Sequence, residues 1–245
     1  MPEVALITGA KRVGLVVAKK ISGYGVHIAT TYHTSEQEAK ELVTAVQQLG
    51  LRAAAFPVDL SQRRQIEPLL VSIEQQLGPI DYLVAMASIF TQGSSLETTE
   101  EQLDRSLAVH LSVLWLIQGL VPRWIKRGNK GKIVVVTDRI VAAGGRPYLG
   151  HYPYYAGKAA LEASVKHWAK EFMGHGITVN AVAPGATQRP REINEKDWQE
   201  LRLGILPGSS DDQMAEQVAE TVRFFLGTNF ITGQTIVVDA GQNLL

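Results

Sequence analysis

The chain has 245 residues and carries 24 basic and 24 acidic side chains, so its formal net charge at pH 7 is zero. This balance provides no basic surface for a polyanion, which argues against nucleic acid as a partner. The chain has no cysteine, which excludes disulfides and thiolate metal sites, and we predict no bound metal.

The N-terminal sequence MPEVALITGA leads straight into a strand-like run. It has neither the basic segment nor the long apolar segment of a signal peptide. We find no run close to the ~18 consecutive apolar residues that indicate a membrane span. We therefore expect a cytoplasmic protein with no membrane partner.

Short apolar runs alternate with segments of helical spacing along the chain. The apolar runs predict seven strands: Val4–Thr8, Val26–Tyr32, Ala53–Asp59, Tyr82–Ala87, Lys132–Thr137, Ile177–Ala183 and Thr235–Asp239. The main helical segments are Val16–Ile21, Glu36–Leu49, Arg63–Leu77, Glu100–Arg127, Tyr154–Met173 and Asp212–Phe225. Continuous apolar strands are typical of sheets that helices cover on both faces. The alternation predicts one Rossmann-type α/β domain, residues 1–245, with a doubly wound, mostly parallel seven-stranded sheet.

The segment Gly185–Ser210 interrupts this alternation. It is polar and contains proline, and we expect it to be irregular. Long loops in compact domains are commonly mobile or functional, so we predict that residues 185–210 form a substrate loop.

The turn after the first strand has the features of a phosphate site. It runs from Gly9 to Gly14 and opens a helix. Glycines let the backbone approach a phosphate, and the helix N-terminus offers free N–H groups. Lys11 and Arg12 add positive charge. A tight connection without a ligand is the alternative.

The end of the second strand indicates which nicotinamide cofactor is used. An acid there would bind a ribose 2′-hydroxyl and repel a 2′-phosphate. The chain instead has His33, Thr34 and Ser35, with no acid before Glu36. This pattern favours NADPH over NADH, although Ser35 also fits the N-cap of the next helix. Asp59, at the end of the predicted third strand, could contact the adenine or cap the strand end.

Tyr154 and Lys158 are spaced i, i+4 at the start of a predicted helix, just after Pro153. They therefore lie on one face of that helix. A nearby ammonium lowers the pKa of a phenol from its ordinary value of about 10, which would make Tyr154 a usable general acid. A surface pair without chemistry is the alternative.

The ordered motifs TGAKRVG, VDL, YYAGK, NAVAPG and ITGQTIVVDAG resemble the short-chain dehydrogenase/reductase family over nearly the whole chain. The resemblance implies that Tyr154 exchanges a proton with the substrate and that Lys158 holds the nicotinamide ribose. It also implies a homo-oligomer, a tetramer or a dimer. The implied cofactor-binding residues are Gly9, Lys11, Arg12, Val13, Gly14, His33, Thr34, Ser35, Asp59, Leu60, Ser88, Lys158, Pro184 and Gly185.

Asp138 replaces the serine that usually ends the fifth strand in this family. An ionised aspartate cannot donate to a carbonyl oxygen and would repel a developing alkoxide. It can lie beside a nitrogen heterocycle or share a proton with Tyr154. Asp138 therefore favours a C=N substrate, with a turn-capping aspartate as the alternative.

Asp138 together with Arg12 resembles the pteridine reductase branch of the family. The stretch Ala87-Ser88-Ile89-Phe90 is similar to that branch's A-S-S-F, whose phenylalanine stacks on the pterin. The resemblance implies a substrate site of Arg12, Phe90, Asp138 and Tyr154. Phe90 as an ordinary core aromatic is the alternative.

Four departures from the family pattern bear on the site. The glycine turn is one residue short, and Ala85-Met86 stands where two asparagines are usual. His110 replaces an asparagine that carries a water-linked proton path to the lysine, and a histidine can relay protons too. Asp138 is about three residues further from Tyr154 than usual, with the extra residues near Gly144–Pro147.

We therefore expect an NADPH-dependent oxidoreductase that transfers hydride to a C=N bond of a small molecule, a pterin or a dihydrofolate-like ring. The expected catalytic residues are Asp138, Tyr154, Lys158 and His110. A carbonyl reductase of the 3-oxoacyl type shares every feature except Asp138. A non-catalytic NADP(H)-sensing protein is a third hypothesis, which the short turn and the missing asparagines motivate.

Overall fold

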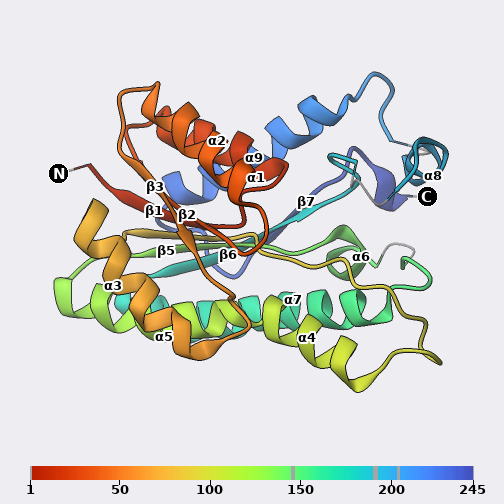
Figure 1. The fold of residues 1–245 in the computed structure, drawn as a ribbon, viewed down its shortest axis with the longest axis horizontal. Helices are drawn as coiled ribbons and strands as arrows, with labels where there is room; N and C mark the ends of the chain where they lie inside the picture. The colour runs from red at the N-terminus through yellow and green to blue at the C-terminus, as the bar shows by residue number, and fades with distance from the viewer. Residues whose placement is uncertain (1, 145–146, 190–192, 203–204, 245) are drawn as a thin grey trace.

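The computed structural model describes residues 2–144, 147–189, 193–202 and 205–244. One seven-stranded sheet runs through the molecule (Figure 1), with strands β1 Val4–Thr8, β2 His27–Tyr32, β3 Ala53–Pro57, β4 Tyr82–Ala85, β5 Lys132–Val136, β6 Thr178–Pro184 and β7 Thr235–Val238. All seven predicted strands are present, and their ends differ from the prediction by two residues or fewer.

The strand order is β3-β2-β1-β4-β5-β6-β7, and every neighbouring pair is parallel. The order reverses between β1 and β4, because the chain winds outward from β1 in one direction and then in the other. This arrangement confirms the predicted doubly wound fold. A crevice at such a reversal, beyond the carboxyl ends of the strands, is where these folds bind ligands.

Helices cover both faces of the sheet (Figure 1). One face carries α1 Val13–Ser22, α2 Glu36–Gln47 and α9 Asp211–Gly227; the other carries α3 Ile66–Leu77, α4 Glu100–His110, α5 Ser112–Arg127 and α7 Tyr152–Phe172. Short 3-10 turns occupy Arg63–Gln65, Met173–His175 and Gln242–Leu244. The short helices α6 Arg139–Ala142 and α8 Glu195–Leu201 lie toward the end of the molecule that carries the C-terminus.

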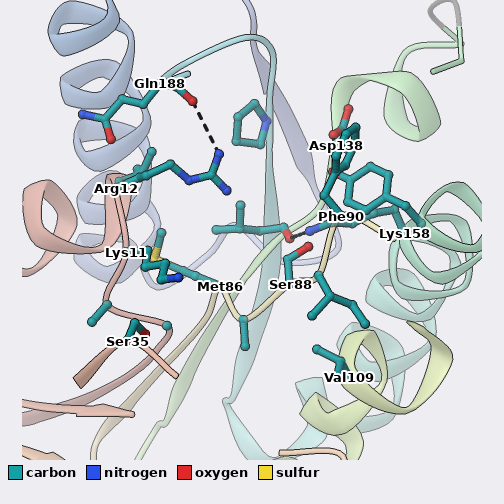
Figure 2. Close-up of a pocket in the computed structure, with 18 of the residues that line it drawn as sticks. Lys11, Arg12, Ser35, Met86, Ser88, Phe90, Val109, Asp138, Lys158 and Gln188 are labelled. Atoms are coloured by element: carbon teal, nitrogen blue, oxygen red, sulfur yellow. Dashed lines mark hydrogen bonds between the residues drawn. The ribbon is translucent and has the colours of Figure 1, made fainter. Parts of the chain in front are cut away.

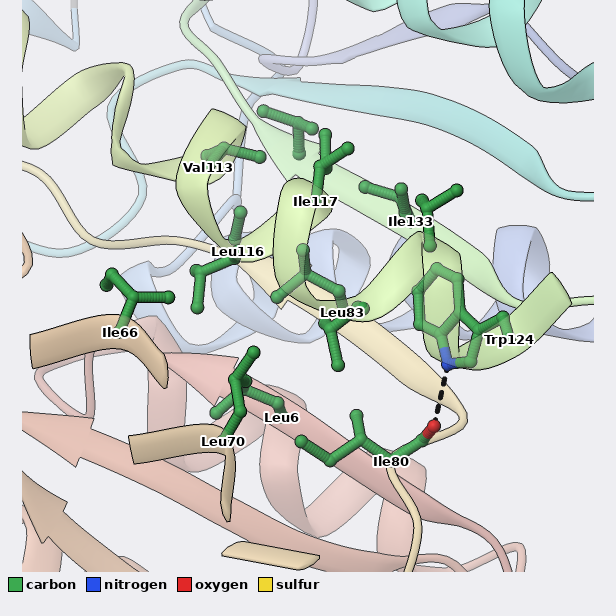
Figure 3. Close-up of a cluster of buried hydrophobic side chains, with 14 of the residues drawn as sticks. Leu6, Ile66, Leu70, Ile80, Leu83, Val113, Leu116, Ile117, Trp124 and Ile133 are labelled. Carbon is green, nitrogen blue, oxygen red and sulfur yellow. Dashed lines mark hydrogen bonds between the residues drawn. The ribbon is translucent and has the colours of Figure 1, made fainter. Parts of the chain in front are cut away.

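A hydrophobic core fills the space between each helical layer and the sheet. On the α5 face, Leu83 and Ile133 of the sheet meet Ile117 and Trp124 of the helix (Figure 3). The indole N–H of Trp124 donates to the Ile80 carbonyl oxygen at 2.7 Å, so the fully buried ring leaves no polar atom unpaired. This packing fixes the helices against the strands whose ends form the site.

The predicted single helix Glu100–Arg127 is divided at Leu111, whose backbone leaves helical geometry. The Ser112 hydroxyl donates to the Val109 carbonyl at the break. Contrary to our expectation, the stretch 100–127 is long and apolar enough to cross a membrane by length and composition. Its apolar window is 44% buried, and the core helix of a soluble protein passes the same test.

The segment 185–210 was expected to be irregular, but its described part contains α8. Seven residues are too few for a clear periodic signal in the sequence. Trp198 anchors this helix, since its side chain is buried. Residues 190–192 and 203–204 of the segment lie outside the described residues.

Candidate active site

A cavity of about 550 Å³ opens at the carboxyl ends of the strands (Figure 2). Lys11 and Ser35 lie toward one end of it, and Phe90, Asp138 and Lys158 toward the other. The predicted residues that line it are Gly9, Lys11, Arg12, Val13, His33, Thr34, Ser35, Asp59, Leu60, Ser88, Phe90, Asp138, Tyr154, Lys158, Pro184 and Gly185. Of the predicted site residues, Gly14 and His110 are buried and do not line it.

The first turn presents the start of α1 to the cavity. Among the described residues, no side chain caps α1, and its first turn contains no acid. The N–H groups and positive dipole end of the helix therefore suit an anionic group such as a pyrophosphate. Gly14 allows the tight turn, because a Cβ there would lie 2.4 Å from the Gly9 carbonyl oxygen.

Arg12, in the first turn, has an unusual backbone conformation. This residue has φ +53°, a left-handed conformation that costs a non-glycine residue free energy. Its guanidinium donates to the Gln188 carbonyl at 3.4 Å and so spans from the first turn to the segment after β6 (Figure 2). Arg12 thereby takes a place between the predicted phosphate site and the predicted substrate site.

Thr8 binds the backbone that follows β4. Its hydroxyl oxygen accepts hydrogen bonds from the backbone N–H groups of Met86 at 3.0 Å and Ala87 at 3.1 Å. These bonds hold the end of β4 against the end of β1. This role of Thr8 was not predicted, since a threonine at a strand end is common.

The part of the cavity beside the ends of β2 and β3 contains the residues predicted to select NADPH. Ser35 occupies the predicted N-cap position of α2, and among the described residues its hydroxyl makes no capping bond. Asp59 does cap the turn after β3, since it accepts from the Ser61 N–H at 3.0 Å and the Ser61 hydroxyl at 2.7 Å. Asp59 also lines the cavity, so its capping bonds are compatible with the predicted contact to the adenine.

Asp138 and Tyr154 form a hydrogen-bonded pair at the other end. The Tyr154 hydroxyl donates to Asp138 Oδ2 at 2.5 Å. Asp138 Oδ1 accepts the Ile140 N–H at 3.0 Å and caps α6, so the aspartate also performs the capping role. Burial raises the pKa of the Asp138 carboxyl above its ordinary value, which favours a proton held on this pair.

The expectation that Lys158 lowers the pKa of Tyr154 is wrong. Burial and the negative charge of Asp138 instead raise the pKa of Tyr154 well above its ordinary value. Lys158 Nζ donates to the Val136 carbonyl at 2.8 Å and lies 5.9 Å from the centroid of the Tyr154 ring. Burial lowers the pKa of Lys158 itself to about 8.

Phe90 belongs to a cluster of aromatic rings at the cavity. It stacks on His151 with 3.9 Å between centroids and meets the ring of Tyr154 edge-on at 4.9 Å. Tyr148 lies 5.7 Å away and also lines the cavity. Phe90 is only half-buried, so it is not an ordinary core aromatic.

Tyr148 was missed because it lies in the unusual stretch between Asp138 and Tyr154, where no family motif marks it. Part of that stretch, Gly145 and Arg146, lies outside the described residues. Arg105, Gln188 and Trp198 also line the cavity without having been predicted. They come from helices and loops whose approach to the sheet edge no local pattern reveals.

His110 is buried behind Ser88, and its Nε2 lies 2.9 Å from the Ser88 hydroxyl. On the cavity side, His110 is therefore hydrogen-bonded to Ser88. Lys158 is hydrogen-bonded to the carbonyl oxygen of Val136. The predicted relay from His110 to the lysine remains a prediction.

The comparisons with known proteins agree with this geometry at the level of the family. A family model described as enoyl-(acyl carrier protein) reductase matches residues 9–243. A 3-oxoacyl-[acyl-carrier-protein] reductase from Synechocystis is 30% identical, covering 98% of this chain and 96% of its own length. The same enzyme from Staphylococcus epidermidis is 29% identical over 99% of both chains.

Two solved structures have the same fold over nearly their whole length. Acetoin dehydrogenase from Enterobacter cloacae has a TM-score of 0.86 at 28% identity, covering 100% of this chain and 96% of its own. A dehydrogenase/reductase from Sinorhizobium meliloti has a TM-score of 0.87 at 29% identity, covering 98% and 95%. None of the relatives named here is a pteridine reductase, and the names of the curated ones match the carbonyl alternative better. The chain belongs to the short-chain dehydrogenase/reductase family of nicotinamide-dependent oxidoreductases.

Proposed function

We propose that this protein is an NADPH-dependent reductase that adds hydride to a C=N bond of a pterin or dihydrofolate-like ring. The observation that carries the proposal is the buried pair of Asp138 and Tyr154, whose oxygens are 2.5 Å apart. Asp138 stands where the family usually has a serine that donates to a substrate carbonyl.

The pair suits a ring nitrogen better than a ketone oxygen. Hydride addition to a ketone places negative charge on its oxygen, and the ionised form of Asp138 would repel that charge. Hydride addition to the carbon of a C=N bond leaves a nitrogen that takes up one proton. In our proposal Tyr154 gives its hydroxyl proton to that nitrogen, and a proton held by Asp138 returns to the Tyr154 oxygen.

The aromatic cluster supports a planar substrate. Phe90, Tyr148 and Tyr154 line the cavity beside Asp138, and flat rings stack favourably on such side chains. Gln188, Ile193 and Trp198 bring the segment 185–210 to the same wall, which supports its role as a substrate loop.

The chain's own residues fit a bound NADPH. The uncapped start of α1 is suited to the pyrophosphate, and Lys11 with the free hydroxyl of Ser35 is suited to a 2′-phosphate. In our proposal Lys158, at the opposite end, binds the nicotinamide ribose. When bound, the cofactor supplies the hydride. Following the family resemblance, we also propose a homo-oligomer built on the stretch 100–127 and α7, which light scattering would test.

A carbonyl reductase is the second candidate, and the names of the curated relatives favour it. It differs from the first proposal in the role of Asp138. In this case the protonated carboxyl, which burial favours, would donate to the ketone oxygen in place of the usual serine.

A steady-state assay of NADPH oxidation separates the candidates. We expect turnover with dihydrobiopterin, dihydromonapterin or dihydrofolate. We expect much weaker turnover with an acetoacetyl thioester or with diacetyl, the diketone that is reduced to acetoin. Turnover of the ketones alone would overturn the pterin proposal in favour of the second candidate. Tight NADPH binding without turnover of either group would instead support a cofactor-sensing protein.

A further inference from the structure

The buried histidine His110 has hydrogen bonds that define where its proton lies. Its Nδ1 is 2.7 Å from the Ser106 backbone carbonyl oxygen, and a carbonyl oxygen can only accept. Nδ1 must therefore carry the proton. The other ring nitrogen, Nε2, is 2.9 Å from the hydroxyl of Ser88.

His110 is uncharged in this setting. Burial, together with the nearby charge of Lys158, lowers the pKa of His110 to about 3. A neutral imidazole with its proton on Nδ1 has an unprotonated Nε2, so the Ser88 hydroxyl donates its proton to that nitrogen. Only the lone pairs of the Ser88 oxygen remain for a molecule in the cavity, which Ser88 lines (Figure 2).

The space that His110 occupies exists because residue 157 is glycine. Gly157 lies on α7 between Tyr154 and Lys158, and a Cβ at this position would be 2.4 Å from His110 Nδ1. The same Cβ would be 3.1 Å from the hydroxyl oxygen of Ser106. Any larger residue at position 157 would push the imidazole away from Ser88.

Ser106 ties this arrangement to the catalytic helix. Its hydroxyl donates to the Pro153 carbonyl at 2.7 Å, in the first turn of α7, and its own carbonyl oxygen accepts the hydrogen bond from His110 Nδ1. The ring of His110 also meets that of Tyr154 edge-on at 5.6 Å. The imidazole is thus held from two helices, α4 and α7.

We propose that His110 is a positioning residue that fixes Ser88 as a hydrogen-bond acceptor for an N–H group of a bound ligand, and that Gly157 admits it. An amide side chain could donate to Ser88 and leave the hydroxyl proton free for the ligand, whereas this histidine tautomer cannot. The N–H group is either the carboxamide of the nicotinamide or a ring or amino N–H of the substrate. The second source rests on the proposed function.

Nitrogen NMR of the ligand-free protein tests the tautomer without any catalysis. The chain has six histidines, and the signals of His110 are identified by their loss in His110→Ala. We expect a protonated Nδ1 and an unprotonated Nε2 at pH 7. A proton on Nε2, or a charged ring, would overturn the proposal.

A double-mutant cycle tests the coupling between Gly157 and His110. Gly157→Ala should lower the Tm of the wild-type protein and lower it much less in a His110→Ala background, where Ser106 is the remaining close neighbour. Gly227→Ala is the matched control, because Gly227 is also helical and a Cβ there meets nothing within 4 Å. Equal effects of Gly157→Ala in both backgrounds would show that the histidine does not depend on this glycine.

Ser88→Ala tests the acceptor and identifies its source, with Ser72→Ala, an exposed residue of α3, as control. A weaker affinity for NADPH, about 3- to 10-fold by fluorescence titration, would place the N–H group on the cofactor. Unchanged NADPH affinity with a similar rise in KM for the dihydropterin would place it on the substrate. Unchanged affinity and KM together would overturn the proposal even if the protein reduces pterins.

Discussion

Replacing Lys158 by methionine should stabilise the ligand-free protein while removing its activity. Lys158 is 3% exposed, and burial lowers its pKa from the ordinary value of 10.5 to about 8. One pH unit corresponds to about 1.4 kcal/mol, so carrying the charge at pH 7 costs about 3 kcal/mol. Losing the hydrogen bond to the Val136 carbonyl offsets about 1 kcal/mol of the gain. The expected net gain is about 2 kcal/mol, or about 4–8 °C in Tm.

The stability advantage of Lys158→Met should depend on pH. A lysine with a lowered pKa in the folded state destabilises the protein fully below pH 8, and this penalty disappears as the pH rises toward 10.5. The advantage of Lys158→Met should therefore be largest at pH 7 and close to zero at pH 9.5. Thermal melts followed by circular dichroism at both pH values measure it.

Lys132→Met is the matched control for this experiment. Lys132 is also buried, but its Nζ donates to two carbonyl oxygens, those of Leu226 and Thr228, each at 2.7 Å. Removing it leaves two acceptors unpaired, so this variant should melt below the wild type. The reasoning would be refuted if Lys158→Met melted no higher than the wild type at pH 7, or kept its full advantage at pH 9.5.

Three further substitutions test other parts of the structure. Arg12→Gly should relieve the positive φ of Arg12 and raise the free energy of unfolding by about 1 kcal/mol, while weakening NADPH binding; denaturant unfolding that shows no gain would contradict this. Ser35→Ala should leave Tm unchanged, because no capping bond is lost. It should weaken the binding of NADPH about 3- to 10-fold and leave the binding of NADH unchanged. Equal losses of affinity for both cofactors would count against a 2′-phosphate contact. Trp124→Phe should lower the free energy of unfolding by only about 1–2 kcal/mol, because Arg127 still donates to the Ile80 carbonyl at 2.7 Å. A loss above about 4 kcal/mol in urea would show that Arg127 does not serve as the substitute donor.

The sheet could be predicted because its strands are continuous apolar runs, and such runs are typical of a sheet that helices cover on both faces. The first strand, Val4–Thr8, has the predicted bounds, and the others differ only at their ends. The helical stretch 100–127 was harder, because its periodicity continues through Leu111 while the backbone does not. The helix α8 is too short to leave a pattern.

The site was predictable where chemistry follows a linear spacing, as in the first turn and the pair Tyr154 and Lys158. The shift in the pKa of Tyr154 had the wrong sign in the prediction, because the sequence does not show burial or the distance to Asp138. The fit between Gly157 and His110 joins residues 47 positions apart and is visible only in three dimensions. Each residue is unremarkable alone.

The specificity of Asp138→Ser tests the central claim most directly. The measured quantity is the ratio of kcat/KM for a dihydropterin to kcat/KM for an acetoacetyl thioester, in the wild type and in this variant. If Asp138 directs Tyr154 to a ring nitrogen, the wild type favours the dihydropterin and the substitution moves the ratio at least 10-fold toward the ketone. A wild type that already prefers the ketone, with a ratio that the substitution leaves unchanged, would contradict the account.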